Sequence, residues 1–141
     1  EAVGPKILEW KQEKDDMAAS EEDKGSIMSI LATDLLLTSR QLKRILKRTG
    51  VGIARTGGYT GHGSGEVMIG FTTANRIPSG CEEELLRLSA IPEHVINRAF
   101  LAAAEAEQEA ILNSMTAAKP TRGRDGELYY SLAEYLNDRN A

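Results

Sequence analysis

An almost continuously apolar run begins abruptly at Ile27, directly after a long charged stretch, and this change constrains the fold more than any other feature. Residues 27–32 read Ile-Met-Ser-Ile-Leu-Ala. A short apolar run of this kind is typical of a strand buried on both faces. We therefore expect a buried strand to begin at this point.

The preceding residues 11–24 have the opposite character. They bury too little apolar surface to offset the entropy lost on ordering, so we expect an exposed, mobile linker or a frayed helix. Such segments are also where a chain is most readily cut. The charged residues are Lys11, Glu13, Lys14, Asp15, Asp16, Glu21, Glu22, Asp23 and Lys24.

The pattern after the first strand predicts alternating helices and strands. A helix is expected from about Ser39, with that serine as its N-cap. Gly50 and Gly52 fall in its second half, where a close approach of helix and sheet is the simplest use for them. The expected apolar stripe of this helix consists of Leu42, Ile45, Leu46 and Ile53.

A second buried strand is expected over 66–73, and a long helix from Pro92 to about Ala118, with Pro120 ending it. A charged turn over 121–126 and a short helix over 128–136 complete the pattern. Strands flanked by packed helices predict an α/β-type layered domain.

Length and charge limit the function. The chain has 141 residues, enough for one domain, and a formal net charge of −4, which argues against a binder of nucleic acid or anionic membranes. A basic cluster at 43–48 is interpreted as the solvated face of a helix. No apolar run approaches the roughly 18 residues that a membrane span needs.

The scarcity of metal-binding residues excludes several kinds of site. Cys81 is a single cysteine, which rules out an internal disulfide, and His62 and His94 are too few and too separated for a zinc site. We expect no metal and no other cofactor. The cysteine content fits the reducing cytoplasm, and a periplasmic location is also compatible.

The glycine-rich segment 57–65 is not a phosphate-binding loop, because Ser64 stands where the essential lysine would be. It is not a hydrolase nucleophile elbow either, since His62 occupies the first glycine position around that serine. Ser64 and Glu66 are two residues apart at the start of a strand, so their side chains share one face. Glu66 is then either paired with a partner or solvated just outside the sheet.

Gly25-Ser26 lies where the polar linker meets the first strand. Cleavage between these residues would place a serine hydroxyl and a free α-amine on one residue, at the tip of a rigid element. An α-amine has a pKa of about 8, which suits a general base near neutrality. Ser26 would then supply nucleophile and base together, as in terminal-threonine enzymes.

Seven short segments between Gly25 and about Gly126 form a pattern in their order and spacing. These segments are Gly25-Ser-Ile-Met, Ala32-Thr-Asp, Gln41-Leu-Lys-Arg, Ala54-Arg-Thr-Gly, Gly63-Ser-Gly-Glu, Phe71-Thr-Thr-Ala-Asn and Gly123-Arg-Asp-Gly. Together they resemble the DmpA and β-peptidyl aminopeptidase family. The resemblance implies a four-layer αββα sandwich like that of the N-terminal-nucleophile hydrolases, of which this chain supplies the C-terminal part.

The resemblance also implies a mechanism. Members of this family are precursors that cleave themselves before the serine, here between Gly25 and Ser26. Ser26 is then implied as the nucleophile, with Ser64 and Glu66 as its catalytic partners. Residues 1–25 would be the end of the upstream (α) segment, and 26–141 the nucleophile-bearing (β) segment.

The partners implied are the upstream polypeptide of the same precursor, a short peptide, amide or ester substrate, and further copies of the paired unit in a homo-oligomer. Family members draw an oxyanion-hole asparagine from the upstream segment, so Asn75 is not given that role. Two alternatives stay open: an acyltransferase like ornithine acetyltransferase, which has a threonine nucleophile, and a non-catalytic scaffolding member.

Overall fold

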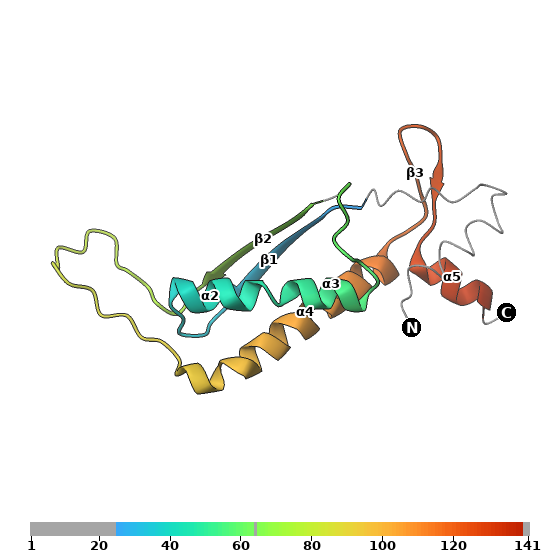
Figure 1. Ribbon diagram of the computed structural model, residues 1–141. Helices are drawn as coiled ribbons and strands as arrows, with labels where there is room; N and C mark the ends of the chain where they lie inside the picture. Colours follow the sequence, from blue (N-terminus) through green and yellow to red (C-terminus); the bar gives the residue numbers. More distant parts are fainter. Residues whose placement is uncertain (1–24, 64, 140–141) are drawn as a thin grey trace.

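A computed structural model describes residues 25–63 and 65–139 of the chain. The charged segment 11–24, expected as an exposed linker, lies outside the described residues. The order of the elements from β1 to α5 is drawn in Figure 1.

Two parallel strands form the central sheet. They are β1 (Ile27–Thr33) and β2 (Glu66–Thr72), paired in register from Ile27 opposite Glu66 to Thr33 opposite Thr72. Both strands were expected from their apolar runs. Because the pairing is parallel, the beginnings of the two strands meet at one end of the sheet.

Three helices lie on one side of this sheet: α2 (Ser39–Leu46), α3 (Thr49–Arg55) and α4 (Ile96–Ala117). Figure 1 shows them beneath β1 and β2. The buried cluster between α2 and α4 consists of Leu37, Ile45, Ile96, Ala99 and Ala103. The layered α/β arrangement expected from the sequence is therefore present.

The helix α2 begins at Ser39 as expected, but its N-cap is Thr38 and not Ser39. The Thr38 side chain accepts a hydrogen bond from the Gln41 amide, and the Gln41 side chain accepts one from the Thr38 amide. This reciprocal pair satisfies two helix-end donors at once. Buried Gln41 also donates to the Ile91 carbonyl at 2.8 Å, which ties α2 to the segment before α4.

The close approach at Gly52 is between helices and not between helix and sheet. A Cβ atom at Gly52 would lie 2.6 Å from the Ala104 carbonyl oxygen of α4. At Gly50 an added Cβ would meet only the Met68 methyl at 3.9 Å, which is ordinary contact. The expected single helix is also two, α2 and α3, separated at Lys47 and Arg48.

The strands are not buried on both faces, contrary to the expectation. On the face away from the helices, Met28 is 79% exposed and Ile30 73% exposed. Their neighbours on β2, Val67, Ile69 and Phe71, are exposed as well. The apolar runs therefore reflect two apolar faces, of which the described residues cover only the one toward the helices.

The region around the start of α4 is held by charge. A short 3₁₀ turn, η1 (Glu93–Val95), precedes the helix, with Pro92 just before it. Glu93 accepts hydrogen bonds from Arg40 and Arg44 of α2. The Arg44 and Arg48 guanidiniums lie over the Phe100 ring, at 5.2 and 4.3 Å from its centroid. This part of the basic cluster is therefore engaged by the protein and is not simply a solvated face.

The C-terminal region differs from the expected turn and helix. Two short strands, β3 (Thr121–Arg122) and β4 (Leu128–Tyr129), form an antiparallel hairpin around the charged turn. The final helix, α5 (Leu132–Arg139), therefore begins later than residue 128. It packs through Leu132 and Tyr135 against Met115 and Tyr130, at the far end of α4.

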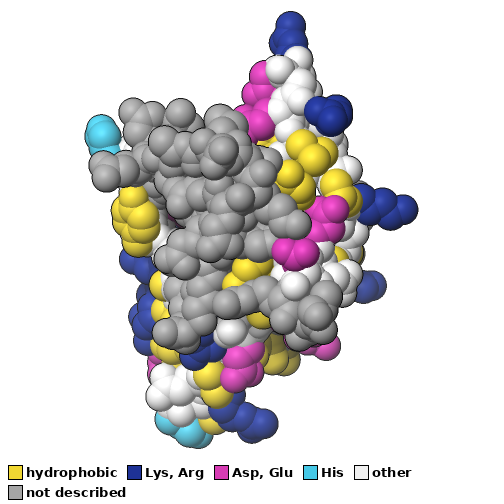
Figure 2. Space-filling model, turned by 90° about the vertical axis from the view of Figure 1, so that its right-hand side faces the viewer, with side chains coloured by type: hydrophobic (Ala, Val, Ile, Leu, Met, Phe, Trp, Pro, Cys, Tyr) yellow, Lys and Arg dark blue, Asp and Glu magenta, His cyan; other side chains and the backbone are white. Residues whose placement is uncertain are grey.

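The charged side chains that can be seen are mixed in sign. Around the margins of the face in Figure 2, Lys and Arg side chains are seen at several places, together with acidic and hydrophobic ones. Among the described residues, no helix has the length and hydropathy needed to cross a membrane.

Candidate active site

Ser26 and Glu66 lie at the same end of the sheet. Ser26 immediately precedes β1, and Glu66 is the first residue of β2. The register that pairs Ile27 with Glu66 fixes this arrangement. Two candidate residues separated by 40 positions in the sequence are thus brought to adjacent strand ends.

The Ser26 hydroxyl is held by the chain that enters β2. The backbone N–H of Gly65 donates a hydrogen bond to Ser26 Oγ at 3.3 Å. In the reverse direction, the Ile27 N–H donates to the Gly65 carbonyl, also at 3.3 Å. Ser26 is otherwise exposed, so its hydroxyl is accessible at the tip of a strand that is anchored by its partner.

Glu66 is half-buried and stands in the alternating series of β2 residues that face the helices. The next members of the series are Met68, whose sulfur accepts a hydrogen bond from the Thr49 hydroxyl, and Gly70, which lies against Leu46. Between the described side chains of Ser26 and Glu66 there is no direct hydrogen bond. The structure therefore brings the two residues to one end of the sheet without joining them.

Ser64 and Gly25 are the two remaining candidate residues. Ser64, the expected partner of Ser26, lies outside the described residues. Gly25, on the other side of the expected cleavage point, is described and exposed. Gly25 and Ser26 are described here as joined by a peptide bond.

The chain that leaves α3 leads toward the start of β2, where Gly65 meets Ser26. At the end of α3, the N–H groups of Gly57 and Gly58 donate to the Ala54 and Ile53 carbonyls. Gly57 has a φ of 107°, a conformation that suits glycine at a helix end. The glycines thus let the chain leave α3 and turn toward the start of β2.

Asn75 has a structural role in the described chain. Its side-chain NH₂ donates to the Ser89 and Leu37 carbonyls, and its oxygen accepts the Ser89 N–H at 3.2 Å. These bonds tie the beginning and the end of the long connection after β2. In this arrangement both ends of the Asn75 amide are engaged by backbone groups.

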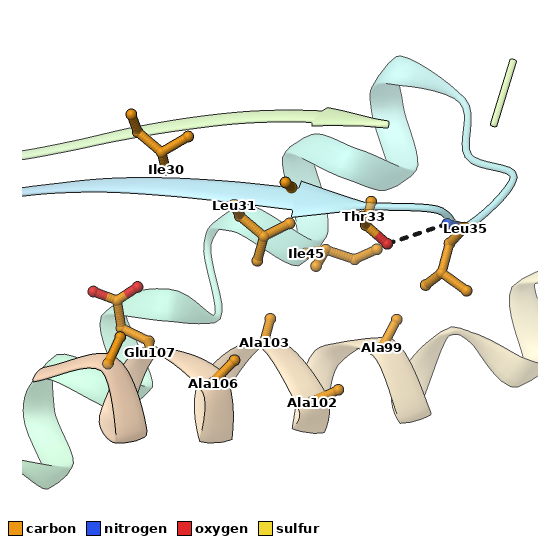
Figure 3. A pocket seen from close by; sticks show the side chains of 12 residues that line it. Ile30, Leu31, Thr33, Leu35, Ile45, Ala99, Ala102, Ala103, Ala106 and Glu107 are labelled. Carbon is orange, nitrogen blue, oxygen red and sulfur yellow. Dashed lines mark hydrogen bonds between the residues drawn. The ribbon is translucent and has the colours of Figure 1, made fainter. Parts of the chain in front are cut away.

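A groove on the helix side of the sheet lies away from Ser26 and Glu66. This groove of about 360 Å³ runs between β1 and α4 and is shown in Figure 3. Its helix side is a row of alanines that includes Ala99, Ala102 and Ala106. The groove is lined mainly by small apolar side chains and so offers little polar chemistry.

One polar pair stands beside this groove. The buried Ser29 hydroxyl donates to Glu107 Oε1 of α4 at 2.6 Å, across 78 positions of sequence. A serine at a core position of β1 is thereby satisfied, as buried hydroxyls require. The sequence pattern did not predict this pair, because it depends on which turn of α4 reaches β1.

The sequence pattern did not predict the contact between the Gly65 amide and Ser26. A backbone donor has no side-chain signature, and glycine in a glycine-rich segment gives no hint of a contact with a distant serine. The parallel register of β1 and β2 is the observation that identifies it.

The sequence matches a known family over most of its length. The model of peptidase family S58 matches residues 3–129. The beta-peptidyl aminopeptidase BapA of Sphingosinicella microcystinivorans is 34% identical over 102 residues, which is 72% of this chain and 26% of that protein.

Solved structures agree in fold. A protein of Pyrococcus horikoshii OT3 has a TM-score of 0.70 and 45% identity, over 78% of this chain and 31% of that one. The L-aminopeptidase D-Ala-esterase/amidase of Ochrobactrum anthropi has a TM-score of 0.69 and 34% identity, over 77% of this chain and 31% of that one.

The Ochrobactrum enzyme is described as a prototype of the serine aminopeptidases and a variant of the Ntn hydrolase fold. The likeness confirms the fold class that the sequence predicted. The chain spans roughly a quarter to a third of the length of these proteins, as the shares of 26% and 31% show.

Proposed function

Because the chain belongs to peptidase family S58, we propose that it forms the nucleophile-bearing part of a serine aminopeptidase or amidase. Ser26 is the nucleophile in this proposal, and Ser64 and Glu66 are its catalytic partners. The names of its relatives, a beta-peptidyl aminopeptidase and an L-aminopeptidase D-Ala-esterase/amidase, support this class of activity.

The observation that carries the proposal is the position of Ser26. It lies at the tip of a strand whose register is fixed by seven paired residues, with its hydroxyl exposed and directed to the start of β2. A nucleophile needs such a rigid and accessible position, because small displacements of its reacting atom lower the rate strongly. Glu66 enters the sheet at the same end.

Self-cleavage is the first step of the proposed mechanism. Ser26 Oγ attacks the Gly25 carbonyl carbon, the C–N bond to Ser26 breaks, and the amine takes up the hydroxyl proton. Water then hydrolyses the ester, leaving the Gly25 carboxylate and a free Ser26 α-amine. The amine becomes the general base of the mature site, with a pKa of about 8 before any influence of its surroundings.

Peptide hydrolysis repeats the same chemistry on a substrate. The Ser26 hydroxyl, deprotonated by its own amine, attacks the carbonyl of the first residue and forms an acyl-enzyme. The leaving amine takes the proton, and water releases the acid in a second step. The proposed substrates are short peptides, amides or esters with a free N-terminal L-, D- or β-amino acid.

The rest of the sandwich is proposed to come from an upstream polypeptide. The exposed face of the sheet is formed by Met28, Ile30, Val67, Ile69 and Phe71, five large apolar side chains on two adjacent strands. A contiguous apolar surface of this kind is typical of an interface. The paired polypeptides are further proposed to assemble as a homo-oligomer.

A substitution tests the nucleophile. In the full-length protein, Ser26→Ala is expected to abolish cleavage before residue 26 and hydrolysis of aminoacyl amides. Ser79→Ala, at an exposed serine outside the site, is the matched control and is expected to behave as the unaltered protein. A Ser26→Ala protein that is processed and active would overturn the assignment.

A further inference from the structure

The Gly65 N–H group occupies an unusual place in the ladder between β1 and β2. In a parallel pair, hydrogen bonds alternate evenly along the two strands. The Ile27 N–H to Gly65 carbonyl bond follows this pattern. The next donor outward is the Gly65 N–H, and a side-chain oxygen, Ser26 Oγ, receives it at 3.3 Å.

The direction of this bond matters for chemistry. Since the amide donates and the hydroxyl accepts, the Ser26 proton is not used by the bond and stays available to a base. An N–H directed at an oxygen stabilises the negative charge that grows on it as the proton leaves. The bond also occupies one lone pair of Oγ, and so it restricts the directions in which the other lone pair and the O–H group can point.

The donor is also preorganised. Gly65 is held by its own carbonyl, which accepts from Ile27, and by the first pair of the register, Ile27 with Glu66. A donor fixed by the backbone needs little rearrangement when charge develops. The continued register would place the same N–H opposite the Gly25 carbonyl, the group attacked in self-cleavage.

We infer that the Gly65 amide is a further catalytic group, which orients Ser26 Oγ and stabilises its developing negative charge in self-cleavage and in peptide hydrolysis. This inference rests on the proposed function, since it acts through the Ser26 hydroxyl. It adds a donor from within the 25–139 region to the serine and glutamate side chains already considered.

The chain offers a sharp pair of variants. A Cβ at Gly65 would meet nothing within 4 Å, so Gly65→Ala keeps the N–H without a clash. Gly65→Pro removes the N–H but restricts the backbone. Glycolic acid can replace Gly65 by stop-codon suppression in cell-free synthesis. The replacement exchanges the amide that carries the Gly65 N–H for an ester, which removes the donor with little change of shape.

The test follows cleavage before Ser26 in newly synthesised full-length protein by mass spectrometry, and kcat and KM of the mature enzyme on an aminoacyl amide. Relative to Gly65→Ala, the glycolic acid protein is expected to cleave about tenfold more slowly or worse, with kcat lowered and KM unchanged. Size exclusion checks that the Gly65→Ala and glycolic acid proteins fold alike. If Gly65→Pro does not fold, the comparison of the glycolic acid protein with Gly65→Ala is the test.

The outcomes separate this inference from the proposed function. Equal rates for the ester and the unaltered protein would overturn the role of Gly65 and leave the function standing. Equal slowing by Gly65→Ala would also overturn it, because the N–H would not be the cause. If the unaltered protein does not cleave before Ser26 and shows no aminopeptidase activity, the proposed function and this inference both fall.

Discussion

At the scale of residues, Glu66 is the candidate catalytic carboxylate. It opens β2 beside Ser26, half-buried, and shares no hydrogen bond with that serine in the uncleaved chain. After cleavage a new amine would appear on Ser26, and a carboxylate at the adjacent strand end is suited to stabilise and orient it.

Glu66→Gln is therefore expected to lower kcat by about 10²-fold or more while the thermal midpoint stays near that of the unaltered protein. Steady-state kinetics and thermal unfolding of the full-length protein check both halves of this prediction. Glu105→Gln, at an exposed carboxylate on α4, serves as the control. Near-normal turnover in Glu66→Gln would mean that this glutamate is only solvated.

Glu93 is the residue for which charge and stability are linked. The hydrogen bond from Arg44 and the nearby charge of Arg40 hold the pKa of the Glu93 carboxyl below its ordinary value. A lowered pKa means that the folded protein favours the charged form. The stability that Glu93 contributes is thus fully present above its ordinary pKa, and is lost as the pH falls through the lowered value.

Glu93→Gln should accordingly lower the unfolding temperature slightly at neutral pH. The effect is small because the ion pairs of Glu93 with Arg40 and Arg44 are exposed to solvent. The difference from the unaltered protein should close under acid conditions, as Glu93 becomes protonated. Thermal melts across this pH range measure it. A difference in unfolding temperature that persisted or increased in acid would contradict the account.

At the scale of elements, the contact between α3 and α4 depends on one glycine. Gly52 lies where an added Cβ would come within 2.6 Å of the Ala104 carbonyl oxygen and of Glu107 Cβ. Neither neighbour can rotate away easily, because one is backbone and the other is the first atom of its side chain. The two helices would have to move apart.

Gly52→Ala is expected to destabilise the fold by about 1–3 kcal/mol, since strain outweighs the better helix propensity of alanine. Gly50→Ala, two residues earlier on the same helix, has space and should stabilise by about 0.5–1 kcal/mol. Chemical denaturation of both variants tests this opposition. Equal effects of the same sign would show that α3 and α4 are not packed as described.

Elements with strong local signals were predictable and those fixed by packing were not. The start of β1, the start of β2 and the end of α4 near Ala118 follow from apolar runs and Pro120. The β3–β4 hairpin was missed because strands of two residues are too short to show periodicity. The neighbour of Gly52 was misassigned because it is set by a helix some fifty positions away.

The candidate site follows the same rule. Ser26 and Glu66 were found from motif and spacing, whereas the Gly65 amide needed the strand register. The apolar pattern of β1 and β2 correctly indicated two apolar faces. It could not indicate that only one of these faces is covered by the described residues, because a sequence pattern shows which faces are apolar and not what packs against them.

At the scale of the whole molecule, the exposed sheet face is the feature with the largest consequence. Its side chains, Ile69 and Phe71 among them, are 58% and 49% exposed on the side away from the helices. In Figure 1 the three helices lie on the other side of β1 and β2. Under the proposed function this face packs on the upstream polypeptide.

Ile69→Glu should then prevent the upstream and downstream polypeptides from remaining together, because a buried carboxylate without a partner is costly. Leu85→Glu places the same charge at a side chain that is 83% exposed in the connection after β2, and is expected to leave the association intact. Co-elution on size exclusion measures both. Normal association of Ile69→Glu would contradict the proposed interface.

The central claim is that Ser26 is an N-terminal nucleophile produced by cleavage of the Gly25–Ser26 bond. Intact mass of the purified full-length protein, measured under denaturing conditions, tests it most directly. The account predicts a piece that begins at Ser26, together with a separate upstream piece. A single unbroken mass spanning Gly25 and Ser26, in a preparation that hydrolyses aminoacyl amides, would contradict it.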